Sequence, residues 1–281
     1  MWLTRPLKFS YTNAMCRAIK STLLERSVFQ QLLTATTAGD ILVAIKDTPY
    51  GKFVKSALEE SMSKGLDAYF QYLYDKVTDR LSEREKAAFF LFFMGRKELR
   101  KRKKEFKNQK DARKIFNKLD REYVEALKKA LNRLDRGDRK DLKIIAGSYF
   151  DLINIITVVR LKFIYQFDAD TILQFVVPFG NIVNDNNVKK LLNLKKLSAV
   201  PSVFPAIFKK SIKDFTDLRR ELYKYHIDVI SKVWYGYPFK LSIPFALLRL
   251  KEIEIKNLKA CIEGVYFGLP EKEIERMLVG V

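Results

Sequence analysis

The residues best suited to chemistry in this chain are Lys251, Glu254 and Asn257, near its C-terminal end. At about 100° per residue, their spacing of i, i+3 and i+6 places all three on one helix face, which is otherwise apolar. A buried carboxylic acid beside a base is typical of a general acid or, with further ligands, of a metal site. An unpaired carboxylate in a core is costly, however, and Lys251 lies one turn away as a natural ion-pair partner. The set is therefore either an active-site acid or a buried structural pair.

The remaining inventory favours the structural interpretation. The chain has a single histidine, His226, and two cysteines, Cys16 and Cys261, and no second carboxylate or histidine stands beside Glu254 in a metal-ligand pattern. Neither GxxxxGK[ST] nor GxGxxG occurs. We therefore expect a non-catalytic protein without cofactor, metal or bound nucleotide, and a packed or surface His226. We also expect both cysteines to be buried free thiols in a reducing compartment, with a disulfide as the alternative.

The polar pair Glu254 and Asn257 has two echoes upstream. Asp151 and Asn154 repeat the acid-x-x-Asn spacing, and Asn13 follows Ser10 in a fainter copy. PYG at 49–51 and PFG at 178–180 give the first two copies another shared feature. These matches predict three helical repeats, roughly residues 1–95, 96–200 and 201–281, within one structural unit. Each repeat would carry a polar joint inside an apolar helix face, built from Lys251, Glu254, Asn257, Asp151, Asn154 and Asn13.

Helical periodicity surrounds these joints almost everywhere, and glycine (11) and proline (8) are scarce, which predicts an all-α fold. Segment 171–177 is the one stretch that could instead be a short buried strand. Five charged residues should form the solvated face of the C-terminal helix: Arg249, Glu252, Lys256, Lys259 and Glu263. The expected N-caps are Ser27, Ser82 and Asp168, and Gly137 should end one helix before Asp138 starts the next. The helices themselves are expected over 10–24, 53–80, 83–94, 112–134, 149–165, 169–177, 185–196, 206–234 and 247–264.

Net charge is +20, and residues 96–143 alone hold 20 Lys and Arg against 9 Asp and Glu. This excess supports an alternative function, a basic helical protein that binds nucleic acid or an anionic surface. No helix-turn-helix, RRM, KH or zinc-finger pattern is present, which makes nucleic acid the weaker choice. The most apolar run, at 87–94, is shorter than the about 20 residues that a membrane span needs. We expect no signal peptide and no membrane span, and hence a soluble or peripheral protein.

Three motifs together resemble one family, the C subunits of the V/A-type rotary ATPases, which are relatives of the d subunit of eukaryotic V-ATPases. The segment ALLRLKEIEIKNLKACIEGVYFGLPEKEIERML, residues 246–278, is similar to the C-terminal stretch of that family, and DLINIITVVRLK and YTNAMCRA are similar to its middle and N-terminal motifs. The C-terminal matches are Lys251, Glu252, Glu254, Asn257, Leu258, Gly268, Leu269, Pro270, Glu273 and Ile274. The upstream matches are Asp151, Asn154, Arg160, Lys162, Tyr11, Asn13, Ala14, Arg17 and Ala18. Met15, Leu161 and Val265 depart from the pattern, and the basic stretch 96–143 has no counterpart that we recognise.

The resemblance implies a funnel-shaped, all-helical protein of three similar subdomains in a pseudo-threefold arrangement. Such a protein is a peripheral rotor part on the cytoplasmic face of the membrane. It would couple the central shaft, made of the D and F subunits, to the membrane rotor ring of c or K and L subunits and transmit torque without touching nucleotide. Anionic lipid headgroups are a further expected partner of its basic surface. The transported ion, H⁺ or Na⁺, is not specified by these motifs.

Overall fold

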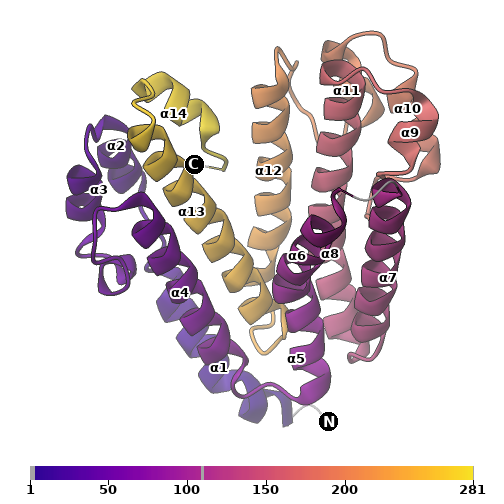
Figure 1. The fold of residues 1–281 in the computed structure, drawn as a ribbon. Helices are drawn as coiled ribbons and strands as arrows, with labels where there is room; N and C mark the ends of the chain where they lie inside the picture. The colour runs from indigo at the N-terminus through magenta and orange to yellow at the C-terminus, as the bar shows by residue number, and fades with distance from the viewer. Residues whose placement is uncertain (1–3, 109–110, 281) are drawn as a thin grey trace. The chain divides into compact units, whose positions relative to one another are not determined.

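A computed structural model describes residues 4–108 and 111–280 of the chain (Figure 1). The chain forms two compact units, one made of Met1–Arg80 with Ile230–Val281 and the other of Leu81–Val229. We call them unit 1 and unit 2. Every regular element in the described ranges is helical, so the prediction of an all-α fold is confirmed. Unit 1 combines the two ends of the sequence, whereas the predicted division into three repeats stays a prediction.

Unit 1 is organised around its longest helix, α13, which spans Ser242–Tyr266 and contacts α1, α3, α4 and α14. Because other helices cover α13 on several sides, one of the five residues expected on its solvated face is buried. Arg249 is 4% exposed instead of solvated, and its guanidinium pairs with Glu252 at 2.6 Å. The other elements of this unit are α1 Thr4–Lys20, α2 Arg26–Thr34, α3 Ala38–Ile45, η1 Pro49–Lys52, α4 Glu59–Thr78, η5 Lys232–Trp234 and α14 Glu271–Met277.

Unit 2 is built on α8, Arg136–Val159, which continues as the π-helical segment η3, Arg160–Ile164. The last helix, α12, Phe215–Ser231, joins α8 through a contact between His226 Nδ1 and Ser148 Oγ at 2.8 Å. His226 is fully buried, as a packed histidine should be. The other elements are α5 Glu83–Phe89, η2 Phe90–Gly95, α6 Arg96–Phe106, α7 Ala112–Asn132, α9 Ala169–Leu173, α10 Asp185–Leu192, η4 Leu197–Ala199 and α11 Val200–Val203.

Most of the run at 87–94 belongs to the core of unit 2, although Phe90 is 50% exposed. Its second half, in η2, is a π-helix, and Phe92 packs edge-on against Tyr149 of α8 with ring centroids 5.5 Å apart. The guanidinium of Arg96 lies over both rings, 4.6 Å from Phe92 and 4.3 Å from Tyr149. Cation–π contacts of this kind allow a buried arginine to sit among aromatic side chains.

Two of the predicted N-caps are confirmed and two helix boundaries are wrong. The Asp168 carboxylate accepts the Thr171 N–H at 2.8 Å, and Ser82 caps α5 in a capping box with Glu85. Helix α2, by contrast, begins at Arg26 with Glu25 as its N-cap, so Ser27 lies inside it. Helix α8 begins at Arg136, which places Gly137 in its first turn instead of between two helices.

Segment 169–177 is helical only over α9, and the helix expected from 206 begins at Phe215. The Asp214 carboxylate accepts the N–H groups of Thr216 and Asp217 at 2.8 and 2.9 Å, and it thereby fixes the start of α12. Residues 174–177 lie outside the helix, and the backbone of Val177 forms hydrogen bonds with the Asn154 side chain.

Within the described ranges, one helical stretch, Arg136–Ile164, is long and apolar enough to cross a membrane by length and composition alone. Of its most apolar window, 72% is buried inside the structure. Core helices pass the same test, and α8 is in contact with α7 and α10. We therefore interpret Arg136–Ile164 as a core helix of unit 2.

The two cysteines are buried free thiols, as predicted. Cys16 lies on α1 and Cys261 on α13, and both have no exposed surface. Burial raises the pKa of each thiol to about 12. At neutral pH both are held as neutral, weakly reactive side chains.

Candidate functional site

The candidate site in unit 1 is the polar set on α13. Lys251, Glu254 and Asn257 are 0%, 6% and 2% exposed, so the helix does carry an acid, a base and an amide inside its packed face. The Lys251 ammonium lies 2.8 Å from Glu254 Oε1. An ion pair this deep is costly to desolvate, and it persists only where further hydrogen bonds satisfy both groups.

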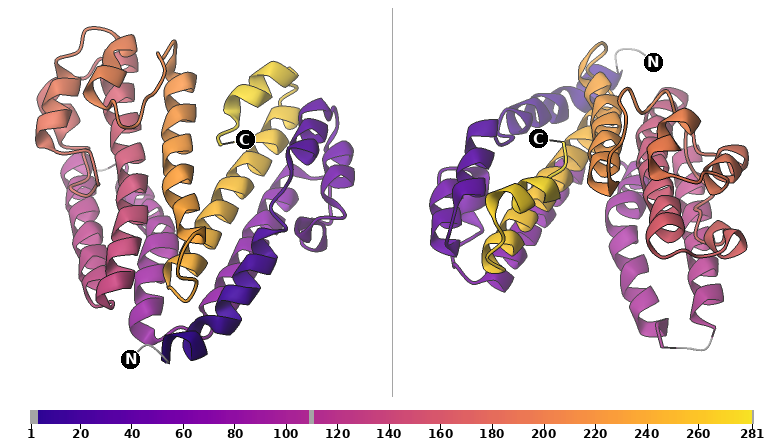
Figure 2. Two further views of the ribbon diagram at one scale, coloured as in Figure 1. Left: turned by 180° about the vertical axis from the view of Figure 1, so that it is seen from behind. Right: turned by 90° about the horizontal axis from the view of Figure 1, so that it is seen from above.

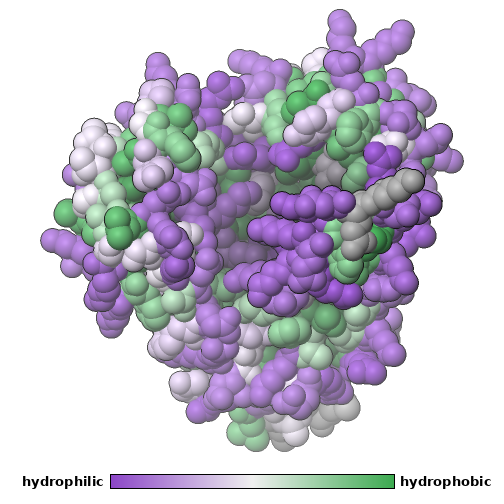
Figure 3. Space-filling view, viewed as in Figure 1, coloured by the Kyte–Doolittle hydropathy of each residue, from purple (hydrophilic) through white to green (hydrophobic). Residues whose placement is uncertain are grey.

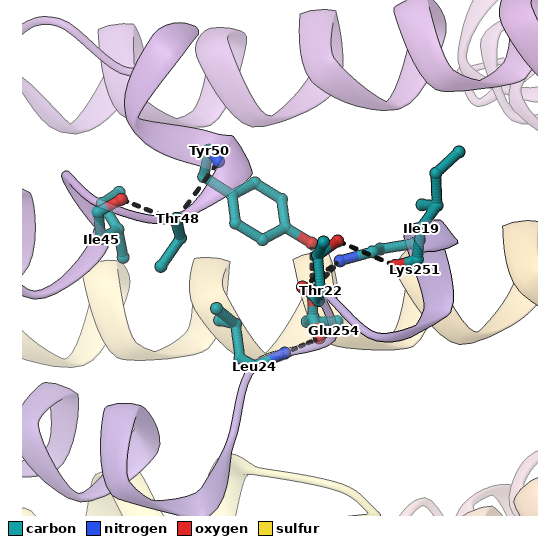
Figure 4. A network of polar contacts seen from close by, with 8 residues as sticks. All are labelled: Ile19, Thr22, Leu24, Ile45, Thr48, Tyr50, Lys251 and Glu254. Atoms are coloured by element: carbon teal, nitrogen blue, oxygen red, sulfur yellow. Dashed lines mark hydrogen bonds and ion pairs between the residues drawn. The ribbon is translucent and has the colours of Figure 1, made fainter. Parts of the chain in front are cut away.

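Those further bonds come from two segments distant in sequence (Figure 4). Glu254 Oε1 also accepts the Tyr50 hydroxyl at 2.5 Å, and Oε2 accepts the Leu24 N–H at 2.7 Å. Lys251 Nζ donates a second bond to the Thr22 carbonyl at 3.0 Å. The ion pair thus joins α13 to the α1–α2 connection and to η1. Both carboxylate oxygens and the ammonium are engaged by groups of the protein itself.

Local structure positions Tyr50 for this contact. It lies in the PYG sequence of η1, whose N-cap is Thr48. The Thr48 hydroxyl accepts the Tyr50 N–H at 3.3 Å and donates to the Ile45 carbonyl at 2.6 Å, which holds η1 against the end of α3 (Figure 4). The Tyr50 ring then lies under the Lys251 ammonium, 5.2 Å from centroid to Nζ.

The pKa values in this cluster shift with burial. Desolvation lowers the pKa of Lys251, and the charge and hydrogen bond of Glu254 oppose that shift. Desolvation and then the Glu254 charge raise the pKa of Tyr50 well above its ordinary value, so the phenol stays protonated and donates. The cluster therefore consists of one cation, one anion and one neutral donor, a balanced arrangement suited to holding helices together.

Asn257 forms a different joint, one turn further along α13. Its Nδ2 donates to the Val279 carbonyl at 2.9 Å, and its Oδ1 accepts the Val279 N–H at 3.0 Å. The amide thus pairs with both backbone groups of one residue, as a neighbouring strand would. We call this arrangement an amide clasp. It fixes the chain that follows α14 against α13.

Unit 2 contains the same clasp. Asn154 of α8 donates from Nδ2 to the Val177 carbonyl at 2.9 Å and accepts the Val177 N–H at 2.8 Å. The clasped residue lies 23 positions after Asn154, compared with 22 positions after Asn257. In both cases a short helix, α9 or α14, separates the asparagine from its partner. The acid-x-x-Asn echo in the sequence thus corresponds to a shared local geometry.

The acid of this second joint is held without a cation. Asp151 has no exposed surface, and its carboxylate accepts the N–H groups of Asn181, Ile182 and Val183 at 3.0, 3.1 and 2.9 Å. Burial raises the pKa of Asp151, and the three backbone donors act in the opposite direction. A Cβ at Gly180 would lie 2.5 Å from Asp151 Oδ1, so the PFG glycine is required for this close approach.

Asn13, the third predicted joint, is arranged differently. It is half-buried on α1 in unit 1, and its Oδ1 accepts the Arg17 Nε–H at 3.2 Å, one turn along the same helix. The structure therefore brings Lys251, Glu254 and Asn257 together on α13, pairs Asp151 with Asn154 on α8, and leaves Asn13 in a local contact. The roles of all six residues as joints stay a prediction.

Sequence reasoning missed the partners of these joints. Tyr50 and Gly180 lie within the PYG and PFG sequences, which the sequence marks only as a feature shared by two repeats. Leu24 and Val177 contribute backbone groups, which leave no side-chain signal. Within residues 4–108 and 111–280, no group of three or more His, Cys, Asp or Glu side chains is placed to hold a metal ion.

Comparisons with known proteins agree with this arrangement of motifs. The chain is 28% identical over 133 residues to the C subunit of the A-type ATP synthase of Archaeoglobus fulgidus. This match covers 46% of this chain and 39% of that relative. It is 25% identical over 173 residues to the protein of the same name from Methanococcoides burtonii, covering 59% and 48%. The match to that of Methanocaldococcus jannaschii, 20% identical over 360 residues, covers 100% of this chain and 90% of the relative. The chain thus spans less than half the length of two of these relatives and nine-tenths of the third.

The match to a family covers most of the polar joints. Residues 96–277 match the family described as ATP synthase (C/AC39) subunit. This range includes Asp151 and Asn154 on α8 and the complete set on α13. The resemblance indicated by the three motifs is therefore confirmed, and the chain belongs to the ATP synthase (C/AC39) subunit family.

Proposed function

We propose that this chain is a non-catalytic rotor subunit that couples the central shaft of a V/A-type ATPase to its membrane ring. The observation that carries the proposal is the burial and bonding of the polar residues on α13 that match the family's C-terminal motif. Lys251, Glu254 and Asn257 are buried, and their polar groups bind other parts of unit 1. Groups bound in this way stiffen a protein, whereas a general acid needs access to a substrate.

Stiffness is the property that torque transmission requires. In unit 1 a single carboxylate holds the α1–α2 connection and η1 to α13, and in unit 2 the Asp151 carboxylate holds the 181–183 backbone to α8. Each bond is local, but removing any one leaves a buried polar group unsatisfied, at about 1–3 kcal/mol. Deformation of either unit is therefore resisted by several such contacts at once.

The repeated clasp supports three related subdomains. Asn154 with α9 and Asn257 with α14 occupy equivalent places in the pattern of long helix, short helix and clasped chain. Asn13, followed by α2, would be the third copy, with its clasp replaced by the contact to Arg17. We propose that the second repeat lies in unit 2 and that the larger parts of the first and third repeats, residues 1–80 and 230–281, lie in unit 1. The pseudo-threefold funnel is a prediction of the same kind.

In this proposal the chain is a peripheral protein at the cytoplasmic face of the membrane. Its partners are the D and F subunits of the shaft and the c or K and L subunits of the ring. A net charge of +20 would complement acidic patches on such partners or anionic headgroups. Nucleotide and ions would be handled by other members of the complex.

Copurification tests this function. The tagged chain, expressed in its own host, should bring down the shaft proteins and the ring from membranes solubilised in mild detergent. A matched variant, Glu254→Gln, should retain less of both partners when the sample is warmed, because its joint is weakened. Consistent absence of both partners from the wild-type preparation would refute the proposal.

A further inference from the structure

A basic stretch without acidic residues lies in unit 2, outside the segment 96–143. Residues 186–213 contain no acidic residue and no arginine, but seven lysines, each of them exposed. We call them the lysine surface: Lys189, Lys190, Lys195, Lys196, Lys209, Lys210 and Lys213. None of the seven ammonium groups has an ion-pair partner in the part of the chain that the structure describes. Their charge is therefore available to an outside partner.

The basic segment 96–143 differs in this respect. Its lysines are interleaved with acids, and five of them form contacts of 2.6–3.9 Å with a carboxylate of the same segment. Lys103, for example, lies 2.6 Å from Asp120 on the neighbouring helix. Part of that positive field is thus neutralised at short range, whereas the field of the lysine surface is not.

The segments that bear the lysine surface gather at one end of unit 2, the end drawn uppermost in Figure 1 and in the left view of Figure 2. Two contacts hold the end of the long helix there. Lys162 Nζ of η3 donates to the Leu192 carbonyl at the end of α10. The Arg160 guanidinium lies over the Phe215 ring at the start of α12, 5.3 Å from its centroid. The end of α10 and the start of α12 therefore both contact η3.

Large apolar side chains are exposed at the same end of the unit. Two of them end helical segments: Ile164 ends η3 and is 53% exposed, and Leu173 ends α9 and is 39% exposed. Between them lie Tyr165 and Phe167, which are 57% and 40% exposed. The rings of Tyr165 and Phe167 lie 6.1 Å apart. In Figure 3 hydrophilic side chains project from this end, with hydrophobic patches between them. Exposed apolar groups among unpaired cations mark an interaction surface.

We propose that the lysine surface and the apolar side chains beside it dock on an anionic lipid membrane. Lysines on flexible stems attract a diffuse layer of headgroups, whereas recognition of nucleic-acid phosphates favours the bidentate fork of arginine, which is absent from 186–213. Tyr165 and Phe167 have the amphipathic and apolar character of residues that sit at the level of headgroups. The inference rests on the proposed function, in which the chain works at a membrane.

Vesicle flotation with the full-length chain tests the proposal. The probes are vesicles of phosphatidylcholine alone and vesicles with about one third phosphatidylglycerol, at low and high salt. We expect binding to the anionic vesicles only, weakened by salt. Each surface lysine contributes about fivefold to partitioning, so the triple variant Lys189→Gln/Lys190→Gln/Lys196→Gln should bind about 100-fold more weakly.

The matched control removes the same charge from the α7–α8 connection and the start of α8, as Arg133→Gln/Arg136→Gln/Lys140→Gln. These three residues are exposed and have no ion-pair partner among the described residues. This control should retain wild-type binding within about threefold, because α8 begins at Arg136 and reaches η3 only at its other end, so these charges lie away from the docking end. Circular dichroism should show unchanged helix content in both triple variants. A Tyr165→Ser/Phe167→Ser variant should lose the binding that persists at high salt.

Equal losses in the two triple variants would overturn the proposal, since total charge and not the lysine surface would then control binding. Equal binding to both kinds of vesicle would overturn it as well. So would tighter binding, through the same lysines, to polyglutamate or to a single-stranded RNA. Copurification distinguishes a failure of the docking surface from a failure of the proposed function. Partners without vesicle binding would refute the docking surface alone, and vesicle binding without partners would refute the proposed function alone.

Discussion

Replacing Glu254 by glutamine should unfold unit 1 more easily, because it leaves a cation inside the core without its counter-charge. Lys251 has no exposed surface, and its ammonium bonds only the Thr22 carbonyl besides Glu254 among the bonds described above. The glutamine amide can retain one acceptor, but its NH₂ group would face the Leu24 N–H or the Tyr50 hydroxyl. Removing one partner of a buried pair costs about 3–5 kcal/mol. With one acceptor kept, we expect about 3 kcal/mol.

The pH dependence of this loss has a defined sign. Burial lowers the pKa of Lys251 below its ordinary value, and Glu254 opposes that shift, so the variant lowers the pKa further. The unfolded chain then binds a proton that the folded chain has lost. Stability of the variant therefore rises with pH between its folded pKa and the ordinary lysine value. The difference between Glu254→Gln and wild type should shrink from pH 7 to pH 9.

Guanidinium unfolding followed by tryptophan fluorescence measures this effect. Both tryptophans, Trp2 and Trp234, belong to the sequence ranges of unit 1, and Trp234 is only 8% exposed. Glu263→Gln is the matched control, because Glu263 lies exposed on the same helix, and it should change stability by less than about 0.5 kcal/mol. Adding Lys251→Met to Glu254→Gln should restore stability to within about 1 kcal/mol of wild type. If Glu254→Gln resembled Glu263→Gln, or if the second substitution added a further loss, the reasoning would be wrong.

Three further outcomes are expected. Asn257→Ala and Asn154→Ala should each cost about 2 kcal/mol, since each leaves a buried backbone pair unsatisfied, while Asn13→Ala should cost under about 0.5 kcal/mol. Fluorescence should detect the loss at Asn257 and circular dichroism the loss at Asn154; three equal losses would contradict the clasps. Cys16 and Cys261 keep their protons to about pH 12 when folded, so stability should fall by about 1.4 kcal/mol per thiol from pH 8 to pH 10, and alanine at both positions should flatten that slope. RNA binding should be weak at physiological salt; tight binding that falls steeply with added salt would instead support the nucleic-acid alternative.

Periodicity predicts which polar residues share a helix face, but it does not predict the groups that bind them. A spacing of three along a helix determines which residues share a face, so the contact of Lys251 with Glu254 follows from sequence alone. The partners at Leu24, Tyr50 and Val177 come from other elements, through backbone groups in two of the three cases. Such contacts depend on how loops return to the helix, which a periodic pattern does not encode.

The errors in boundaries and faces have the same origin in tertiary contacts. Ser27 has the local sequence of an N-cap, but α2 starts earlier, at the end of a connection that Glu254 binds through Leu24. Arg249 lies on the polar side of a helical wheel, but α13 is covered on several sides, so its charged groups must pair within the unit. Residues 96–143 carry the larger charge excess, but only the run at 186–213 is free of acidic residues.

The buried acids Glu254 and Asp151 illustrate how one repeated pattern is satisfied by different chemistry. The residue three positions before the acid is Lys251 in unit 1 and Ser148 in unit 2. Glu254 therefore has a cation on its own helix and needs only one backbone donor, from Leu24. Asp151 lacks that cation, and three consecutive N–H groups take its place, which requires the glycine at 180 for close approach. Ser148 instead bonds His226 and so ties α8 to α12. What α8 and α13 share is thus a position for a buried acid and a clasping asparagine, and each unit compensates the acid with the groups that its own packing brings near.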